Sequence, residues 1–245
     1  MPPYGALVVD AAAAGRMRIR MHVHHLPGES PLRRVLVPAT PLRRMHITKV
    51  LWQHSGALIG SRADLLRLGA LFRLAATSPH SLVYLPLREN VRSEAVTYWD
   101  AGQGLADLVI GRSDTALRPS AWPILRASVR RGLKVGALAT VRTPAPRPRP
   151  EERQPASEWE RERHPLRATE HADTLLLSGS ARALHEVGDE LTWCGEQVAL
   201  NSEIHRFGGP ALLSQVNGPA RRAGRRDASW HFMVLAEDHL FHRDR

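Results

Sequence analysis

The chain has 245 residues, of which 43% are hydrophobic and 24% are charged, so its composition is that of a folded protein and not of a disordered one. No apolar run approaches the ~18 residues that a membrane-spanning helix requires, and we therefore expect no membrane span. The formal net charge is +10, from 34 basic and 24 acidic residues. Only Lys49 and Lys134 are lysines, and an arginine-rich, lysine-poor chain is typical of a GC-rich genome. Part of the basicity therefore reflects codon usage.

The compartment is predicted from the cysteine count and the N-terminus. Cys194 is the single cysteine, which excludes an internal disulfide and a cysteine-based zinc site. The apolar patch near the N-terminus contains Asp10 and has no basic segment before it, so we expect no signal peptide. The cytosol is the expected location.

The first 52 residues alternate strand and turn signals. Residues 5–10 and 16–26 are predicted strands. In the second strand one face is apolar and the opposite face is basic and solvated. The apolar face holds Met17, Ile19, Met21 and Val23, and the basic face holds Arg16, Arg18, Arg20, His22 and His24. Three prolines divide residues 30–52 into short extended pieces.

A strand, a helix and a strand follow. Residues 56–59 form a short apolar strand, and Ser61 is placed to cap a helix with Asp64 in a weak capping box. Leu65, Leu68 and Phe72 would share the buried face of that helix, which should end near Thr77. The segments that complete this part of the chain are a strand at 81–87, two strands at 94–100 and 105–112 joined as a hairpin by "AGQG", a helix from Pro119 to 133, and a strand at 134–143.

Residues 144–165 contain six prolines and a run of mixed charge, so we expect a polyproline II-like or disordered linker. Beyond it, residues 172–179 are a predicted strand and 180–194 a helix. Leu184, Val187 and Leu191 would be buried in that helix, while Arg182, Glu186, Asp189 and Glu190 would form its solvent face. Later strands are predicted at 196–204, 211–216 and 229–238, with a basic loop at 217–227.

Residues 58–72 and 177–191 repeat Leu, Gly, Ser, Leu and Gly at the same offsets. The repetition indicates either an internal duplication or two strand-to-helix turns built in the same way. We predict a mixed α/β (α+β) fold of short, largely antiparallel strands covered by two or three helices. The expected organisation is an N-terminal lobe (1–143), a linker (144–165) and a C-terminal lobe (166–245), and a single sheet with the linker as an excursion is the alternative.

The residues give little indication of an enzyme. The Gly-Ser turns lack the phosphate-binding patterns GxxxxGK[ST] and GxGxxG, and no GxSxG nucleophile motif occurs. Cys194 is predicted to be a buried thiol, and the pairs Asp189–Glu190 and Glu237–Asp238 to be surface charge. We expect no cofactor and no catalytic residue.

Residues 22–29 resemble the first metal motif of the cupins, because His22 and His24 are followed by Glu29. Histidines at i and i+2 of a strand share a face, so they could chelate a metal. The resemblance implies a metal-dependent enzyme, although no second cupin motif is present. A metal enzyme at these three residues remains an alternative.

The basic clusters are the best candidates for a binding surface. They could contact an acidic protein partner or a nucleic-acid backbone, and no nucleic-acid-binding consensus decides between the two. The helix pattern G-S-x3-L-x2-[LV]-G is similar to that of small bacterial α/β immunity-type proteins, which implies a partner-binding role. The leading hypothesis is a non-catalytic cytosolic interaction protein. The candidate residues are Arg16, Arg18, Arg20, Arg33, Arg34, Arg43, Arg44, Arg221, Arg222, Arg225 and Arg226.

Overall fold

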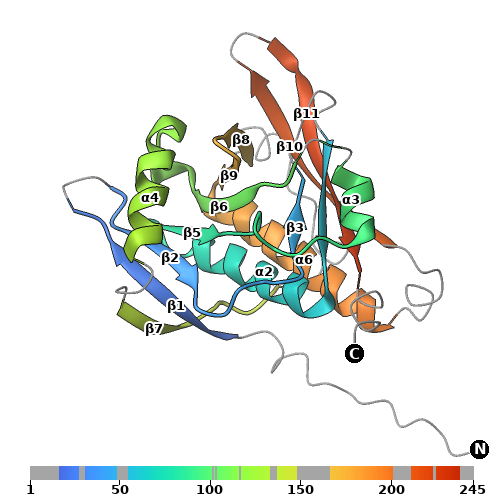
Figure 1. The fold of residues 1–245 in the computed structure, drawn as a ribbon, viewed down its shortest axis with the longest axis horizontal. Helices are drawn as coiled ribbons and strands as arrows, with labels where there is room; N and C mark the ends of the chain where they lie inside the picture. The colour runs from blue at the N-terminus through green and yellow to red at the C-terminus, as the bar shows by residue number, and fades with distance from the viewer. Residues whose placement is uncertain are drawn as a thin grey trace, which may run out of the picture.

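A computed structural model gives the fold, and it describes residues 17–27, 31–48, 55–100, 102, 104–115, 117–132, 137–147, 166–200, 211–222 and 225–237. These residues form a mixed α/β fold with two mixed sheets, and this confirms the predicted fold class (Figure 1). The helices among them are α2 (Arg62–Ala76), α3 (Glu94–Asp100), α4 (Trp122–Gly132) and α6 (Ala181–Leu200), with 3-10 turns at Ser113–Thr115 and Pro119–Ala121.

The larger sheet has seven strands in the order β7-β1-β2-β5-β6-β9-β8, and the smaller sheet has four in the order β10-β11-β4-β3. The larger sheet consists of β1 (Arg18–His25), β2 (Arg34–Pro38), β5 (Ser81–Leu85), β6 (Asp107–Arg112), β7 (Ala137–Arg142), β8 (Arg167–His171) and β9 (Thr174–Gly179). The smaller sheet consists of β3 (His46–Ile47), β4 (Ser55–Gly60), β10 (Ala211–Arg222) and β11 (Arg225–Ala236).

The two sheets meet just before β6. Leu105 forms an isolated bridge with Thr48, and the N–H of Ala106 donates to the carbonyl of Ile47 at 2.9 Å. Strands from both predicted lobes lie in each sheet, because β9 pairs with β6 and β11 pairs with β4. The division of the chain into two lobes stays a prediction.

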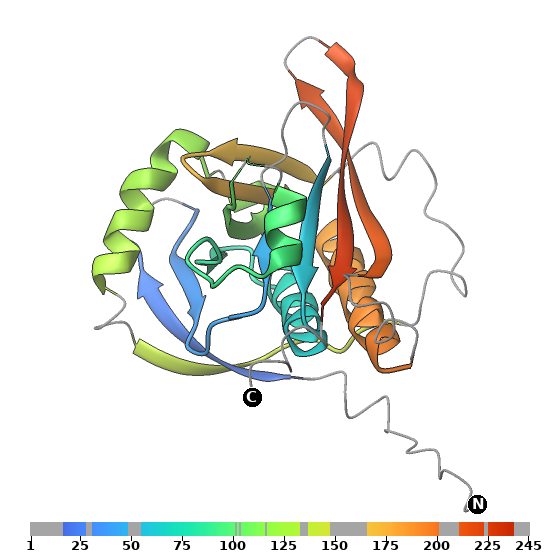
Figure 2. The same ribbon diagram turned by 45° about the vertical axis from the view of Figure 1, so that its right-hand side comes forward.

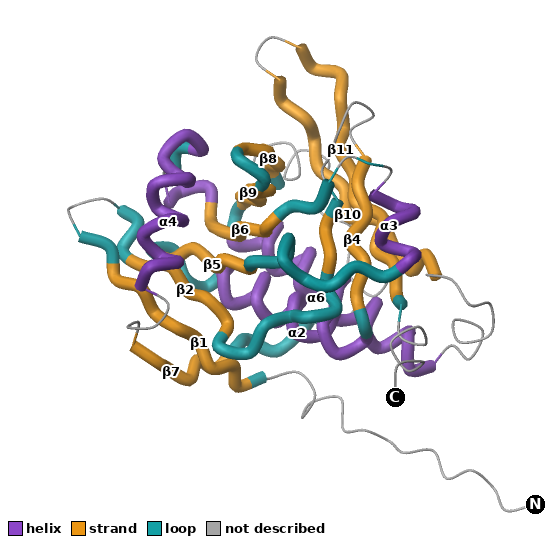
Figure 3. The backbone as a smooth tube through the Cα atoms, in the orientation of Figure 1, coloured by secondary structure: helices purple, strands orange, loops and turns teal. Residues whose placement is uncertain are grey.

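Helices α2 and α6 form a pair that packs against one side of both sheets (Figures 1 and 3). From Leu68 to Ala76 every residue of α2 is buried, as expected of a helix that is apolar around its circumference. On the other side of the strands, the shorter helix α4 covers the larger sheet and α3 covers the smaller one. Alternate residues of β2 divide between the two sides, since Leu36 packs toward the helix pair and Val35 and Val37 pack toward α4.

The repeated sequence marks the starts of both helices and the point where they touch. The N–H of Asp64 donates to Oγ of Ser61 at 3.2 Å, and the N–H of Ala183 donates to Oγ of Ser180 at 3.1 Å. Gly69 and Gly188, which occupy equivalent places in the repeat, lie in contact. A Cβ atom on Gly69 would come within 2.6 Å of the Gly188 carbonyl oxygen, so both positions require glycine.

Two predicted strands are helices. Residues 94–100 form α3, which begins where Oγ of Ser93 accepts from the N–H of Val96 at 3.2 Å. The segment was predicted as a strand because it contains β-branched and aromatic residues, which favour strands. The hairpin predicted around "AGQG" was therefore wrong. Residues 196–200 continue α6, because the buried positions Leu184, Leu191, Cys194 and Val198 follow one helix face. The remainder of the strand predicted at 196–204 lies outside the described residues.

The predicted basic loop at 217–227 is also largely strand. β10 and β11 continue through it as an antiparallel hairpin that projects from the molecule in both views (Figure 2). Its register shifts between Leu212 and Ser214 and between Ala220 and Arg222, so β10 carries two irregularities. The predicted strand at 5–10 and residues 148–165 of the predicted linker lie outside the described residues.

The glycine contact between α2 and α6 can be tested by substitution. Gly69→Ala should lower the free energy of unfolding by about 2 kcal/mol, because overpacking against backbone outweighs the ~1 kcal/mol gained in helix propensity. Urea denaturation measures this difference. Gly195→Ala is the control at another helix glycine, since its Cβ would meet the Leu66 side chain at 2.8 Å and the nearest backbone oxygen, that of Arg62, only at 3.2 Å. Equal destabilisation by both substitutions would contradict the close backbone contact.

Candidate functional site

Three exposed arginines lie together on β1 and β7. Arg18 and Arg20 are exposed while Ile19 and Met21, which alternate with them, are buried, and this confirms the predicted alternation at this end of β1. Arg142 on β7 is directly opposite Arg18 in the antiparallel pair, so its side chain shares their face of the sheet. Arg16 lies outside the described residues. We call Arg18, Arg20 and Arg142 the arginine strip.

The arginine strip is on the side of the sheet that carries α4, beyond the area that α4 covers. α4 packs through Trp122 and Val129 onto β2, β5, β6 and β9, whereas β1 and β7 lie beside it at the sheet edge (Figure 1). The same face of β7 carries Leu138, which is 56% exposed. The strip is therefore an open surface with an apolar residue beside the charges.

The arginine strip has an unfavourable arrangement of charge. Like charges directly opposite each other on neighbouring strands are destabilising, and Arg18 faces Arg142. Among the described residues, none of the three arginines has an acidic side chain in ion-pair contact. A guanidinium presents five N–H donors in a planar fork that matches a carboxylate or a phosphate. The arrangement is suited to binding an anionic group.

Other arginines of the predicted surface lie elsewhere. Arg33 and Arg34 are at the opposite end of the β1–β2 ladder, where Arg34 pairs with His25 and its Nε donates to Oγ of Ser81 at 2.7 Å. Arg43 and Arg44 are in the turn after β2, where the N–H of Arg44 donates to Asp64 at 2.9 Å beside the start of α2. Arg34 thus begins β2 and Arg33 precedes it, while Arg43 and Arg44 lie in a turn, so none of the four is on β1 or β7.

The hairpin arginines do not join the arginine strip. The backbone of Arg221 and Arg222 lies at the end of β10, and that of Arg225 and Arg226 at the start of β11. The hairpin projects at the end of the molecule opposite β1 and β7 in both views (Figures 1 and 2). The structure thus brings together two of the predicted residues and adds Arg142, which the prediction missed. The sequence could not show that β7 pairs with β1, because strand pairing across 120 residues leaves no local signal.

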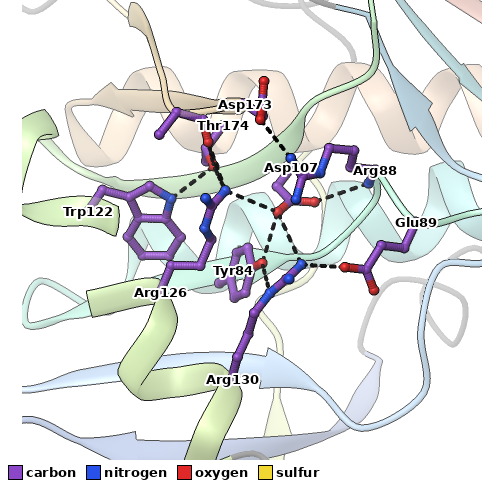
Figure 4. A network of polar contacts seen from close by, with 10 residues as sticks. Tyr84, Arg88, Glu89, Asp107, Trp122, Arg126, Arg130, Asp173 and Thr174 are labelled. Carbon is purple, nitrogen blue, oxygen red and sulfur yellow. Dashed lines mark hydrogen bonds and ion pairs between the residues drawn. The ribbon is translucent and has the colours of Figure 1, made fainter. Parts of the chain in front are cut away.

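A buried polar network holds α4 in place next to the strip (Figure 4). At its centre, Asp107 is fully buried and accepts from the Tyr84 hydroxyl at 2.9 Å and from the N–H of Arg88 at 3.1 Å. Arg126 and Arg130 of α4 lie 3.7 Å from the same carboxylate. Burial, together with the charge of Asp107, raises the pKa of Tyr84 to about 12, so the phenol stays protonated.

The outer part of the network pairs the remaining charges. Arg88 contacts Asp173 at 2.7 Å, and Arg130 contacts Glu89 at 2.7 Å. Arg126 donates to the carbonyl of Ala172 at 2.8 Å and so holds the β8–β9 turn. Three arginines therefore meet three carboxylates, and the network is neutral within itself. Its arginines anchor α4 and are not a site for an external anion.

Asp107 should be essential for the stability of this network. Asp107→Asn removes the charge beneath two arginines and should lower the free energy of unfolding by roughly 3 kcal/mol. Glu89→Gln is the control, because this carboxylate is exposed and its ion pair should contribute less than about 0.5 kcal/mol. Denaturant titrations measure the free energy of unfolding of both variants. Equal losses would contradict the central role of Asp107 in the network.

The histidines of the cupin-like segment lie at the covered end of β1. His22 is half-buried and His24 is buried, because the last turn of α4 covers this end and Gly132 lies against the ring of His24. The prediction of a solvated face was therefore wrong at His24. Burial, and secondarily the nearby His22, lowers the pKa of His24. Glu29 lies outside the described residues, and within those described no cluster of three potential metal ligands occurs.

A second buried polar cluster lies between α2 and α6. Arg73 is 1% exposed and donates to the Gly188 carbonyl at 2.9 Å, to the Pro144 carbonyl at 3.0 Å, and to Thr192. Asp189 is 3.8 Å from Arg73 and 3.2 Å from Nδ1 of His185. Asp189 was predicted on the solvent face of its helix, and that prediction was wrong because the α2 helix packs over it. Burial lowers the pKa of Arg73, and Asp189 opposes this shift.

Buried groups without partners gather where α3 covers the smaller sheet. Both ring nitrogens of His46, Oδ1 of Asp100 and Oε1 of Glu237 are buried and have no hydrogen-bond partner. Ser93 donates to the other carboxylate oxygen of Glu237 at 2.8 Å. Burial raises the pKa of Glu237, so the predicted surface charge at this position was wrong. Burial, with Arg92 nearby, lowers the pKa of His46 to about 4.

His46 makes the fold sensitive to acid. The pKa of His46 in the folded protein lies below the ordinary histidine pKa of about 6.5. The unfolded chain therefore binds the proton more tightly, and stability is lost as the pH falls from 6.5 toward 4. His46→Leu should be more stable than the wild type, and its advantage should grow by about 2 kcal/mol between pH 7 and pH 5. Urea denaturation at pH 7 and at pH 5 measures this difference in stability. His25→Gln, at an exposed position of β1, is the control. Parallel pH curves for wild type and His46→Leu would contradict it.

Among the residues described, the hydrogen bonds and ion pairs of these clusters lie inside the fold. Cys194 is buried, as predicted. Glu237 accepts a hydrogen bond from Ser93, and Asp189 contacts Arg73 and His185. Within the same residues, no helix is long and apolar enough to cross a membrane. Comparisons with models of known families, with curated proteins and with solved structures find no match to this chain.

Proposed function

We propose that this chain is a non-catalytic, cytosolic interaction protein that binds an acidic protein partner through the arginine strip. The observation that carries the proposal is the direct opposition of Arg18 and Arg142 on an uncovered sheet face. Such a pair weakens the sheet, and an acidic side chain placed between the two guanidinium groups would relieve the repulsion.

A protein partner suits this surface better than a nucleic acid. A protein that follows a phosphate backbone typically makes about 6–10 phosphate contacts, whereas the strip offers three arginines and the hairpin arginines lie at the opposite end of the molecule. The exposed Leu138 beside the strip offers an apolar contact of the kind found within protein interfaces. Both features favour a partner that combines carboxylates with apolar side chains.

The proposal predicts opposite effects of one substitution on binding and on stability. Arg142→Glu turns a like-charge pair into an attractive one, so the free energy of unfolding should rise by about 0.5 kcal/mol. Binding of the acidic partner should weaken about tenfold or more, which corresponds to about 1.4 kcal/mol. Loss of binding in a more stable protein cannot result from misfolding.

The experiment captures partners on the immobilised chain from a nuclease-treated lysate of the source cell. The captured protein is then purified and its affinity is measured for wild type, Arg142→Glu and Arg167→Glu. Arg167 is the matched control, since it is an exposed strand arginine at the other edge of the same sheet. An acidic protein that binds wild type and Arg167→Glu but not Arg142→Glu supports the proposal. Equal binding by all three proteins, or capture that nuclease abolishes, contradicts it.

A further inference from the structure

The four outer strands of the two sheets differ in how their free edges are protected. Natural proteins protect edges with charges, proline, bulges or very short strands. β8 carries Arg167 and Glu170, β10 carries two register shifts and Pro219, and β3 has only two residues. β7 (Ala137–Arg142) has six residues, contains neither proline nor a register shift, and has a single charge at its end. Among the described strands, β7 is thus the edge with least protection.

The backbone groups of β7 that point outward can be identified. The N–H of Thr143 donates to the Met17 carbonyl at 2.9 Å, so odd-numbered residues of this segment bond toward β1. The alternation of an antiparallel pair then directs the N–H and C=O groups of Leu138, Thr140 and Arg142 away from β1. No described strand pairs with this outer side. Leu138, Thr140 and Arg142 also have exposed side chains, which lie on the same face of the sheet as Arg18 and Arg20.

We propose that an extended acidic segment of the partner pairs with the free edge of β7 and becomes an eighth strand of the larger sheet. This inference rests on the proposed function and specifies how the partner binds. Backbone hydrogen bonds to alternate β7 residues supply affinity, and a carboxylate of the added strand faces Arg142. Charge decides the occupant, because the chain carries a net charge of +10 and a second copy would add like charges at the same edge.

The side-chain pattern that fits is an alternation of acidic and apolar residues. On the α4 side of the added strand, a carboxylate lies opposite Arg142. The arginine side chains of β1, on the neighbouring strand, are long enough to reach toward it. On the other side, the neighbours are Val141 and Ala139, which are half-buried, and Val141 packs against the core that the helix pair covers. An alternating Glu-Val decapeptide therefore presents the fitting face on each side, and an alternating Lys-Val decapeptide is the matched control.

The test combines this peptide with amide exchange and two variants. The Glu-Val peptide should slow exchange at the amides of Leu138, Thr140 and Arg142 by roughly tenfold or more, and leave Ala139 and Val141 unchanged. Thr140→Pro removes an outward N–H while Arg18, Arg20 and Arg142 remain, and proline is tolerated at such an edge position. This variant, shown to be folded by circular dichroism, should bind the peptide at least about tenfold more weakly.

The outcomes separate the mode of binding from the proposed function. Loss of binding in both Thr140→Pro and Arg142→Glu, with protection of the three outward amides, supports strand addition. Binding that Arg142→Glu abolishes and Thr140→Pro does not, without amide protection, overturns strand addition and leaves the acidic partner in place. Equal binding of the Lys-Val peptide, or protection of β7 by a second copy alone, overturns the acidic occupant.

Discussion

The close contact of α2 with α6 at Gly69 and Gly188 determines how the rest of the molecule is arranged. Gly69 and Gly188 let the two helix backbones approach closely. The carbonyl oxygen of each glycine lies within 2.7 Å of the position that a Cβ atom on the other would occupy. The pair then fills one side of both sheets, and the buried Arg73 ties the two helices together through the Gly188 carbonyl. Both sheets are thus positioned by one helix pair, and strands distant in sequence are brought into register around it.

This arrangement leaves the other side of the strands to shorter helices. α3 and α4 each cover only part of a sheet, and α4 is held where it is by the charges around Asp107. Those charges neutralise one another, and the arginine strip lies on the part of this side that α4 leaves uncovered. The location of the proposed interface therefore follows from what the helices do not cover.

Local patterns in the sequence predicted the elements well where one residue type decides the conformation. Ser61 caps its helix as predicted, and the alternation of Arg18, Ile19, Arg20 and Met21 gave the correct faces of β1. Predictions failed where tertiary packing decides. The segment 94–100 has strand-forming residues but forms a helix on the smaller sheet, and Asp189 is polar but buried because another helix covers it. The site required knowledge of strand order, which placed Arg142 opposite Arg18.

The parallel pairing of β11 with β4 has a consequence for synthesis of the chain. Ser55 pairs with His231, so the smaller sheet joins two strands that lie far apart in the chain. Until β11 emerges from the ribosome, β4 pairs only with the two residues of β3, and the edge along which Ala57 and Ile59 pair with Met233 and Leu235 is open. Contacts so distant in sequence slow folding. The nascent chain therefore carries an unpaired apolar strand edge while the residues between β4 and β11 are synthesised, and such edges are prone to aggregate.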